Sequence, residues 1–578
     1  MKKKYQGIIL FSAMAVVLIL KLGVIRKLFE LSLWPDMNFY LNLGLQPGVA
    51  LPVLGSILTQ ISGIPVLGVA LVLLSLWCLM CIAKGIHGEG NARFLPAVAA
   101  FLFIAGFDYS LYTFRSQGLL FSQTLGLTFA SLGILGWLKL KSTGLAPVYP
   151  VILVVAGYPL IGAYAVLALV SVFVDSLVSK KWLPAGLALV AGVCIPLVYS
   201  HFVFTHIDTR YTFLAGLPYM DFVDNHRRFI PLAVAMLFVA ILPVIRSSKA
   251  PKVPFLPVLT VLVFLIGVFP YWNRNFHIEI GMQHAIEKNN WDKALRLCRK
   301  TDKPTRIIVM YRNIALANKG LLCDEMFTFP NESVGIDTPA QISQTEVCAP
   351  VVFFYNGLIN YSTRWAWEMS MMFQRTLERY KYQAKVALFT GQENPSLVER
   401  YLDIIDRNLY QRKWVRKYRS MLEDPSLLAS DPEYKMFKAL DNFEEVKYMS
   451  SAVVENTILN HFMLQEHPEG VMLDESLAAS MTAKDMDMFW YFYDILLASG
   501  RRIPTHVAEA AILFAYIGRN QAEIDAVARD LGGPDTPVVK RFIDFSSKAS
   551  AGDEKACREK FGDTYWYYIY FVKSITTD

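Results

Sequence analysis

Long apolar runs fill the first 271 residues of the chain, and short polar segments separate them. Runs of some 15 to 22 residues begin at residues 7, 64, 95, 118, 182, 229 and 253. A helix needs about 20 mainly apolar residues to cross the hydrocarbon core of a bilayer. The pattern therefore predicts a polytopic bundle of membrane helices over residues 1–271.

Residues 146–178 form an apolar run that is too long for one helix, and Gly157-Tyr158-Pro159 interrupt it. Proline removes a backbone N–H that a helix interior needs, so we expect a turn there between two short helices. With this turn the chain has nine spans. A cytoplasmic N-terminus then places twelve Lys and Arg side chains inside and six outside, as the positive-inside rule requires.

The run that begins at residue 7 follows Lys2, Lys3 and Lys4 but has no small-residue cleavage site at its end. We expect a retained first helix rather than a secretory signal, with Lys21 extending to the outer surface. An odd number of spans places residues 272–578 on the far side from the N-terminus. For a bacterial inner-membrane protein, that side is the periplasm.

From residue 272 onward the spacing of apolar residues changes to that of amphipathic helices. Trp291, Ala294, Leu295 and Cys298 recur at intervals of three and four. Residues 290–300 resemble the second helix of a tetratricopeptide repeat, with Ala294 at the small position. Further helix pairs are predicted at 307–327 with a break at Gly320, and at 397–421, 433–461 and 486–517; strand signals are scarce beyond 351–355.

This alternation of short helices and turns predicts an all-α fold, a membrane helix bundle followed by a soluble, tetratricopeptide-like α-solenoid. The alternative is a helical lid that packs on the membrane half. The charge distribution supports a membrane-embedded first part and a soluble second part. Residues 1–271 hold 19 basic and 8 acidic side chains, and residues 272–578 hold 37 basic and 41 acidic ones. An acidic second half argues against a nucleic-acid partner.

Motifs for several enzyme classes are absent from the sequence. It has no His-Glu-x-x-His, phosphate-loop, dinucleotide-binding or Gly-x-Ser-x-Gly pattern, and His461 and His467 are spaced by six, which does not place them on one helix face. We therefore expect no metal and no cofactor. Cys298, Cys323, Cys348 and Cys557 could pair as disulfides in a periplasm or stay free as buried thiols.

Ionisable residues gather in the loops that the predicted topology places on the outer side. The candidates are Glu30, Asp36, Asp108, Arg115, His206, Asp208, Arg210, Asp221, Asp224, Arg227 and Arg228. Arginine forks match phosphate oxygens, and a carboxylate can accept a proton, so these residues are a candidate site. The alternative is a set of solvated interfacial loops.

Three segments carry a resemblance to a known family. They are Phe29-Glu-Leu-Ser-Leu-Trp-Pro-Asp36, Leu45-Gln-Pro-Gly-Val49 and Leu58-Thr-Gln-Ile-Ser-Gly-Ile-Pro-Val-Leu-Gly68, and the likeness extends through residues 157–164. They resemble a family of Bacteroidota multi-pass inner-membrane proteins, domain of unknown function 6057. Ile57 stands where that family is expected to have an aromatic residue. The resemblance implies an architecture and no activity.

The order of many membrane helices, an acidic first outer loop and a trailing helical domain is also similar to that of membrane glycosyltransferases that use polyprenyl-phosphate sugar donors. That likeness implies Asp36, with Glu30, as catalytic carboxylates. It implies the arginines and the loop residues His206, Asp208, Asp221 and Asp224 as substrate-binding groups. The paired acidic motif of those enzymes is missing, because Glu30 and Asp36 are six residues apart with Pro35 between them.

Two functions follow as expectations. The first is an inner-membrane protein that presents a periplasmic helical-repeat domain to an envelope protein, with the lipid bilayer as its other partner. The second is a transferase that acts on a lipid-linked sugar. The first function needs no catalysis and the second is enzymatic, so the sequence leaves open whether the chain is an enzyme.

Overall fold

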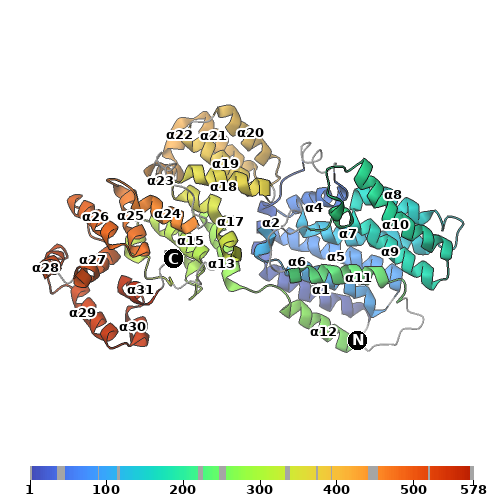
Figure 1. Ribbon diagram of the computed structural model, residues 1–578, viewed down its shortest axis with the longest axis horizontal. Coiled ribbons are helices and arrows are strands. Elements are labelled where there is room, and N and C mark those ends of the chain that lie inside the picture. Colours follow the sequence, from blue (N-terminus) through green and yellow to red (C-terminus); the bar gives the residue numbers. More distant parts are fainter. Residues whose placement is uncertain are drawn as a thin grey trace. The chain divides into compact units, whose positions relative to one another are not determined.

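The computed structural model describes residues 3–35, 46–88, 90–112, 118–218, 226–245, 255–331, 339–372, 375–391, 394–440, 454–518 and 521–572. All regular secondary structure in these ranges is helical (Figure 1). The all-α prediction is confirmed. The strand signal at 351–355 was wrong, because these residues end helix α17 (Pro339–Tyr355).

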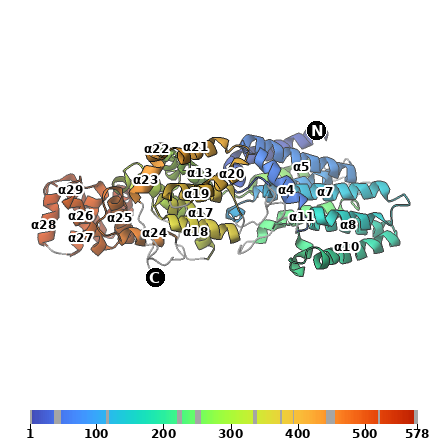
Figure 2. The ribbon, with the colours of Figure 1, turned by 90° about the horizontal axis from the view of Figure 1, so that it is seen from above.

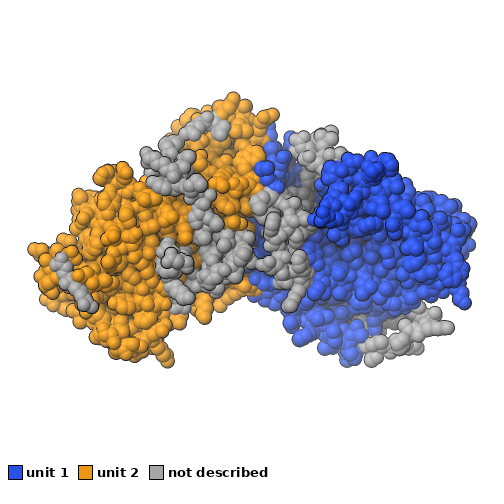
Figure 3. Space-filling model, viewed as in Figure 1, with its two compact units in different colours: residues 1–272, 370–380, 403–415 blue, residues 273–369, 381–402, 416–578 orange. Residues whose placement is uncertain are grey.

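The chain divides into two compact units, which Figure 3 distinguishes by colour. Unit 1 comprises Met1–Trp272, Ser370–Tyr380 and Asp403–Val415, and unit 2 comprises Asn273–Met369, Lys381–Leu402 and Arg416–Asp578. The main division therefore falls between Trp272 and Asn273. Two short segments from the second half of the chain belong to the first unit.

Unit 1 is built from apolar helices. They are α1 (Lys3–Leu20), α2 (Leu22–Glu30), α4 (Ala50–Ile61), α5 (Pro65–His87), α6 (Leu95–Ala105), α7 (Leu119–Leu140), α8 (Tyr149–Ile161), α9 (Ala163–Val178), α10 (Trp182–Phe202), α11 (Ile230–Ile241) and α12 (Phe255–Val268). Helix α7 lies beside both α4 and α5 (Figure 2). Close approach of α4 to the start of α7 depends on Gly55 and Gly118, since a Cβ on Gly55 would lie 2.6 Å from the Gly118 carbonyl oxygen.

Three of these helices, α5, α7 and α10, are long and apolar enough to cross a membrane. The bent pair α1 and α2, with 66° between its parts, would make a fourth. The remaining apolar helices that the structure describes are shorter than the roughly 20 residues that a straight span requires. The described residues thus contain three or four candidate spans by length and composition, and the count of nine stays a prediction.

The run over residues 146–178 does form two helices, but the break lies at Gly162 rather than at Gly157-Tyr158-Pro159. Gly162 has a φ of 55°, and its Cβ would lie 2.2 Å from the Ala215 carbonyl oxygen. Pro159 stays inside α8. Pro159 has no N–H, so it cannot donate the usual helix hydrogen bond to the Val155 carbonyl. The Tyr199 hydroxyl donates to that carbonyl instead, at 2.9 Å.

Unit 2 consists of shorter amphipathic helices. Those wholly inside it are α13 (Arg274–Ile286), α14 (Trp291–Cys298), α15 (Arg306–Ala317), α16 (Leu322–Glu325), α17, α22 (Pro425–Ser430), α23 (Pro432–Leu440), α24 (Val454–Met463), α25 (Gly470–Ala483), α26 (Met486–Ala498), α27 (Thr505–Gly518), α28 (Gln521–Asp530), α29 (Pro537–Ser550), α30 (Glu554–Phe561) and α31 (Tyr565–Phe571). Helices α18 (Ile359–Met372), α19 (Leu377–Thr390), α20 (Pro395–Asp406) and α21 (Arg412–Glu423) each contribute residues to both units.

Local sequence explains many of these helix starts. The side chains of Asn290, Thr305, Asp485 and Asp553 each accept a hydrogen bond from the backbone N–H three residues later, which satisfies a donor that the helix itself cannot. Gly320, with a φ of 66°, separates α15 from α16 as the sequence indicated. Short, well-capped helices therefore form where the pattern predicted helix pairs.

Contacts between distant helices distinguish unit 2 from a simple repeat stack. Helix α16 packs against both α25 and α27, more than a hundred residues later. The Arg306 guanidinium forms a buried ion pair with Glu455, with 2.6 Å between Nε and Oε2. In a solenoid each repeat contacts only its neighbours. The tetratricopeptide-like solenoid therefore stays a prediction, although the helices themselves are present.

The segment Asp403–Val415 is held in unit 1 by Tyr410. The Tyr410 hydroxyl donates to the Ile61 carbonyl at 3.3 Å, and its ring packs edge-on against Phe29. The same ring lies over Gly63, where a Cβ would be 2.0 Å from Cδ2. Beside it the Trp34 N–H donates to the Asn408 side chain at 3.0 Å. Only a residue without a side chain fits beneath Tyr410.

We expect Gly63→Ala to displace the Tyr410 ring, because the new methyl group overlaps it. Hydrogen exchange in residues 403–415 of the full chain in detergent should speed up at least several-fold. Gly85→Ala is the matched control, since a Cβ there meets Leu135 at an ordinary 3.5 Å. Unchanged exchange in Gly63→Ala would contradict this packing.

Candidate functional site

Five of the eleven site residues expected from the sequence lie outside the described part of the chain. These are Asp36, Arg115, Asp221 and Asp224, together with the side chain of Arg227. The structure therefore places six of the candidates: Glu30, Asp108, His206, Asp208, Arg210 and Arg228.

The six described candidates do not form one cluster, although Asp108 and Arg228 form an ion pair. Glu30 pairs with Arg26 one helical turn earlier, at 4.0 Å. Asp208 caps the short helix η3 (Thr209–Leu214) by accepting from the Arg210 N–H at 2.9 Å, and the Arg210 guanidinium lies 3.4 Å from its carboxylate. His206 is exposed nearby in the sequence. No described contact joins Glu30 to the Asp208–Arg210 pair or to Arg228.

Arg228 occupies a buried polar cluster at the end of α6. Its guanidinium lies 2.6 Å from the Asp108 carboxylate and 4.8 Å from the centre of the Tyr271 ring. The Ser110 N–H and hydroxyl both donate to the other oxygen of Asp108. A guanidinium that is already paired with a carboxylate is a poor clamp for a donor phosphate, the role expected for Arg228.

Lys21 belongs to the same cluster and is 3% exposed, which corrects the expectation that it reaches the outer surface. Its ammonium group donates to the carbonyl oxygens of Ala105 and Phe107, where α6 ends. The Tyr271 N–H donates to Ala105 as well, at 3.2 Å. A cation at a helix C-terminus satisfies carbonyls that lack an intrahelical partner. Lys21, Asp108, Arg228 and Tyr271 thus join four segments of unit 1 that lie between or at the ends of helices.

A second buried charge, Lys27, holds the start of α19 in unit 1. Lys27 is 1% exposed, and its ammonium group lies 2.5 Å from the Glu378 carboxylate and 5.5 Å from the centre of the Tyr112 ring. The two charged residues are 351 positions apart. No spacing pattern in the sequence could have indicated this pair.

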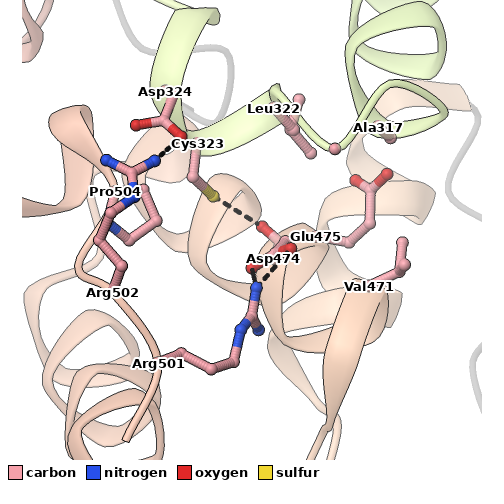
Figure 4. Close-up of a pocket in the computed structure, with 11 residues that line it drawn as sticks. Ala317, Leu322, Cys323, Asp324, Val471, Asp474, Glu475, Arg501, Arg502 and Pro504 are labelled. Atoms are coloured by element: carbon pink, nitrogen blue, oxygen red, sulfur yellow. Dashed lines mark hydrogen bonds and ion pairs between the residues drawn. The ribbon is translucent and has the colours of Figure 1, made fainter.

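Unit 2 contains a cavity of about 270 Å³ between α16, α25 and the segment that joins α26 to α27 (Figure 4). Arg501 faces Asp474 with two N–O distances of 2.8 and 2.9 Å, and it also donates to the Gly470 carbonyl. Arg502 pairs with Asp324. Both arginines at this cavity are therefore already paired with carboxylates.

Asp324 also caps α27 from a distant part of the chain. It accepts from the Thr505 N–H at 2.8 Å and from the Thr505 hydroxyl at 2.9 Å. Burial alone would raise the pKa of Asp324, but these hydrogen bonds and the Arg502 charge lower it below its usual value. Asp324 therefore stays ionised and ties α16 to α27.

Glu475 is the unusual group at this cavity. It is 7% exposed and has no hydrogen-bond or ion-pair partner in the part of the chain that the structure describes. In Figure 4 its side chain extends from α25 toward Ala317 and Leu322. Burial, with a smaller contribution from the Asp474 charge, raises the pKa of Glu475 to about 8. A carboxyl in this environment holds its proton at neutral pH.

The four cysteines of the second half are buried thiols, none joined in a disulfide in this structure. Cys323 lies at the cavity, where its thiol donates to the Asp474 carbonyl at 3.1 Å. Burial raises the pKa of the Cys323 thiol well above its usual value. A thiol that keeps its proton is a weak nucleophile, so Cys323 is suited to packing rather than to covalent chemistry.

We predict that Lys27→Met lowers the free energy of unfolding by roughly 3 kcal/mol, because Glu378, whose side chain is only 12% exposed, then loses its ammonium partner. Lys27→Met combined with Glu378→Leu should recover most of the loss. Denaturant unfolding of the full chain in detergent, followed by tryptophan fluorescence, measures both. Arg210→Ala is the control, since its exposed pair contributes little. A double variant as unstable as Lys27→Met would contradict the pairing.

A second prediction concerns pH. The folded chain keeps the Glu475 proton that the unfolded chain loses above about pH 4.5, so this group makes the free energy of unfolding fall as pH rises toward 8. The slope approaches about 1.4 kcal/mol per pH unit. Glu475→Gln should flatten it, and the exposed control Glu466→Gln should not. Identical pH profiles for wild type and Glu475→Gln would refute the raised pKa.

Comparison with known proteins identifies the family. A model described as a family of unknown function (DUF6057) matches residues 29–572, which run from α2 through α31 and thus include both units. No curated protein and no solved structure matches the chain. The family that the three N-terminal segments indicated is therefore confirmed: the chain belongs to the DUF6057 family of unknown function.

Proposed function

We propose that the chain is an integral inner-membrane protein whose helical second half lies in the periplasm and binds another envelope protein. The N-terminus lies in the cytoplasm. In this role unit 1 is the membrane anchor and unit 2 supplies the binding surface.

The outward faces of the candidate spans support the membrane anchor. On α5 and α10 the exposed side chains include Leu74, Trp77, Leu189 and Val190, each more than two fifths exposed. Large apolar surfaces are costly in water and are normal against lipid. The buried Lys21 and Lys27 of unit 1 lie at helix ends and are matched by carbonyl oxygens and by the Glu378 carboxylate.

The observation that carries the proposal is the way α19, α20 and α21 enter both units. Lys27–Glu378 and the packing of Tyr410 on Gly63 fix their ends in unit 1, while the rest of these helices belongs to unit 2. The chain therefore passes between the two units at more places than the one at Trp272. Such attachment suits a domain that a membrane protein presents to a partner.

Exposed apolar side chains in unit 2 supply a candidate contact surface. Tyr516 on α27 is 52% exposed and packs on Phe542 of α29, and the adjacent Ile543 is 61% exposed. Aromatic and aliphatic side chains of this kind are common anchors at protein interfaces. A sugar transferase built on Asp36 stays a prediction of the sequence alone.

We predict that a reporter active only in the periplasm gives signal when fused after Asp578 of the full chain. In the same cells, a photo-crosslinking residue at Tyr516 or Ile543 should give discrete protein adducts, and one at the polar, exposed Glu466 should not. A reporter active only in the cytosol would refute the sidedness. Equal crosslinking at all three positions, or none at any, would refute the interaction surface.

A further inference from the structure

The cavity between α16, α25 and the α26–α27 segment joins acidic and apolar walls. Asp324, Asp474 and Glu475 lie on it together with Ala317, Leu322 and Val471. We propose that this cavity binds an alkyl cation, namely an alkylammonium or alkylguanidinium group such as a lysine or arginine side chain or a free amine. This site does not depend on the membrane topology or on the contact surface proposed above.

The charges at the cavity favour a cation over an anion. Arg501 and Arg502 are engaged by Asp474 and Asp324, so an incoming anion would have to break an existing ion pair. Glu475, in contrast, is a buried carboxyl to which no residue that the structure describes donates a hydrogen bond. A buried carboxyl that lacks partners gains most from a ligand that brings N–H groups and positive charge.

The apolar lining indicates the rest of the ligand. Ala317, Leu322, Val471 and Pro504 offer methyl, methylene and ring carbons beside the carboxyl (Figure 4). A bare metal ion would leave these walls without contacts, whereas an alkyl chain that carries a cationic end matches both kinds of surface. The volume of about 270 Å³ exceeds the roughly 30 Å³ share of one water several times over.

Proton release should accompany binding. The neutral Glu475 carboxyl loses its proton to solvent, and the resulting carboxylate pairs with the incoming cation, so charge and atoms balance. The titratable groups that share the cavity with Glu475 are Cys323, Asp324, Asp474, Arg501 and Arg502. Glu455 shares a smaller void on the other side of Glu475 and is paired with Arg306. Glu475 is therefore the carboxyl left for a ligand.

The test is calorimetric titration of the full chain in detergent with n-butylguanidinium chloride, in buffers of different ionisation enthalpy. We expect saturable binding with release of close to one proton at pH 7. Affinity should rise about tenfold between pH 7 and 9 as the carboxyl ionises. The neutral analogue n-butylurea should bind at least tenfold more weakly.

Glu475→Gln should abolish the proton release and weaken binding at least tenfold, while Glu466→Gln leaves both unchanged. A melting curve of Glu475→Gln without ligand shows that the variant is folded. A second arm uses the peptide acetyl-Gly-Arg-Gly-amide: tighter binding than the free cation points to a protein side chain, and weaker binding points to a small amine. No saturable binding of either probe, or binding that Glu475→Gln leaves intact, overturns the proposal.

Discussion

An apolar helix bundle can bury a charged side chain only where an opposite charge or a free carbonyl meets it. In unit 1 the buried Lys21 and Lys27 and the partly buried Arg228 follow this constraint. Lys21 meets the last carbonyls of α6, Arg228 meets Asp108, and Lys27 meets Glu378. Because desolvating an unpaired charge costs several kcal/mol, these pairings determine which loops lie together. The last of them also holds the start of α19, from the second half of the chain, in the first unit.

Local sequence predicted the helices because their signals are local. The stripe at Trp291, Ala294 and Cys298 became α14, with Ala294 fully buried, and Gly320 separates α15 from α16. The prediction of secondary structure failed where the local sequence was compatible with two structures. The apolar residues 351–355 resemble a strand in isolation, yet they continue a 17-residue helix, and Pro159 stays within α8 because Tyr199 satisfies the carbonyl that it frees.

The candidate sites were far less predictable, since they depend on residues that are distant in the sequence. Nothing in the pattern around Lys27 indicates Glu378, and nothing around Glu475 indicates that the Cys323–Asp324 turn and the Arg501–Arg502 segment will enclose it. Burial determines the chemistry of both groups, and burial is a property of the folded chain. The sequence did single out both Asp108 and Arg228, but their ion pair gives Arg228 a different role from the phosphate clamp expected of it.

The hydroxyl of Tyr199 has a consequence for how this chain can change over time. In the membrane setting proposed above, no water is available to satisfy the Val155 carbonyl once Pro159 is present. The Tyr199 hydroxyl is therefore needed there only while position 159 is a proline. Substitution of either residue removes the reason for keeping the other. Positions 159 and 199 should therefore covary among related chains, with a helix-forming residue at the first wherever the second has lost its hydroxyl.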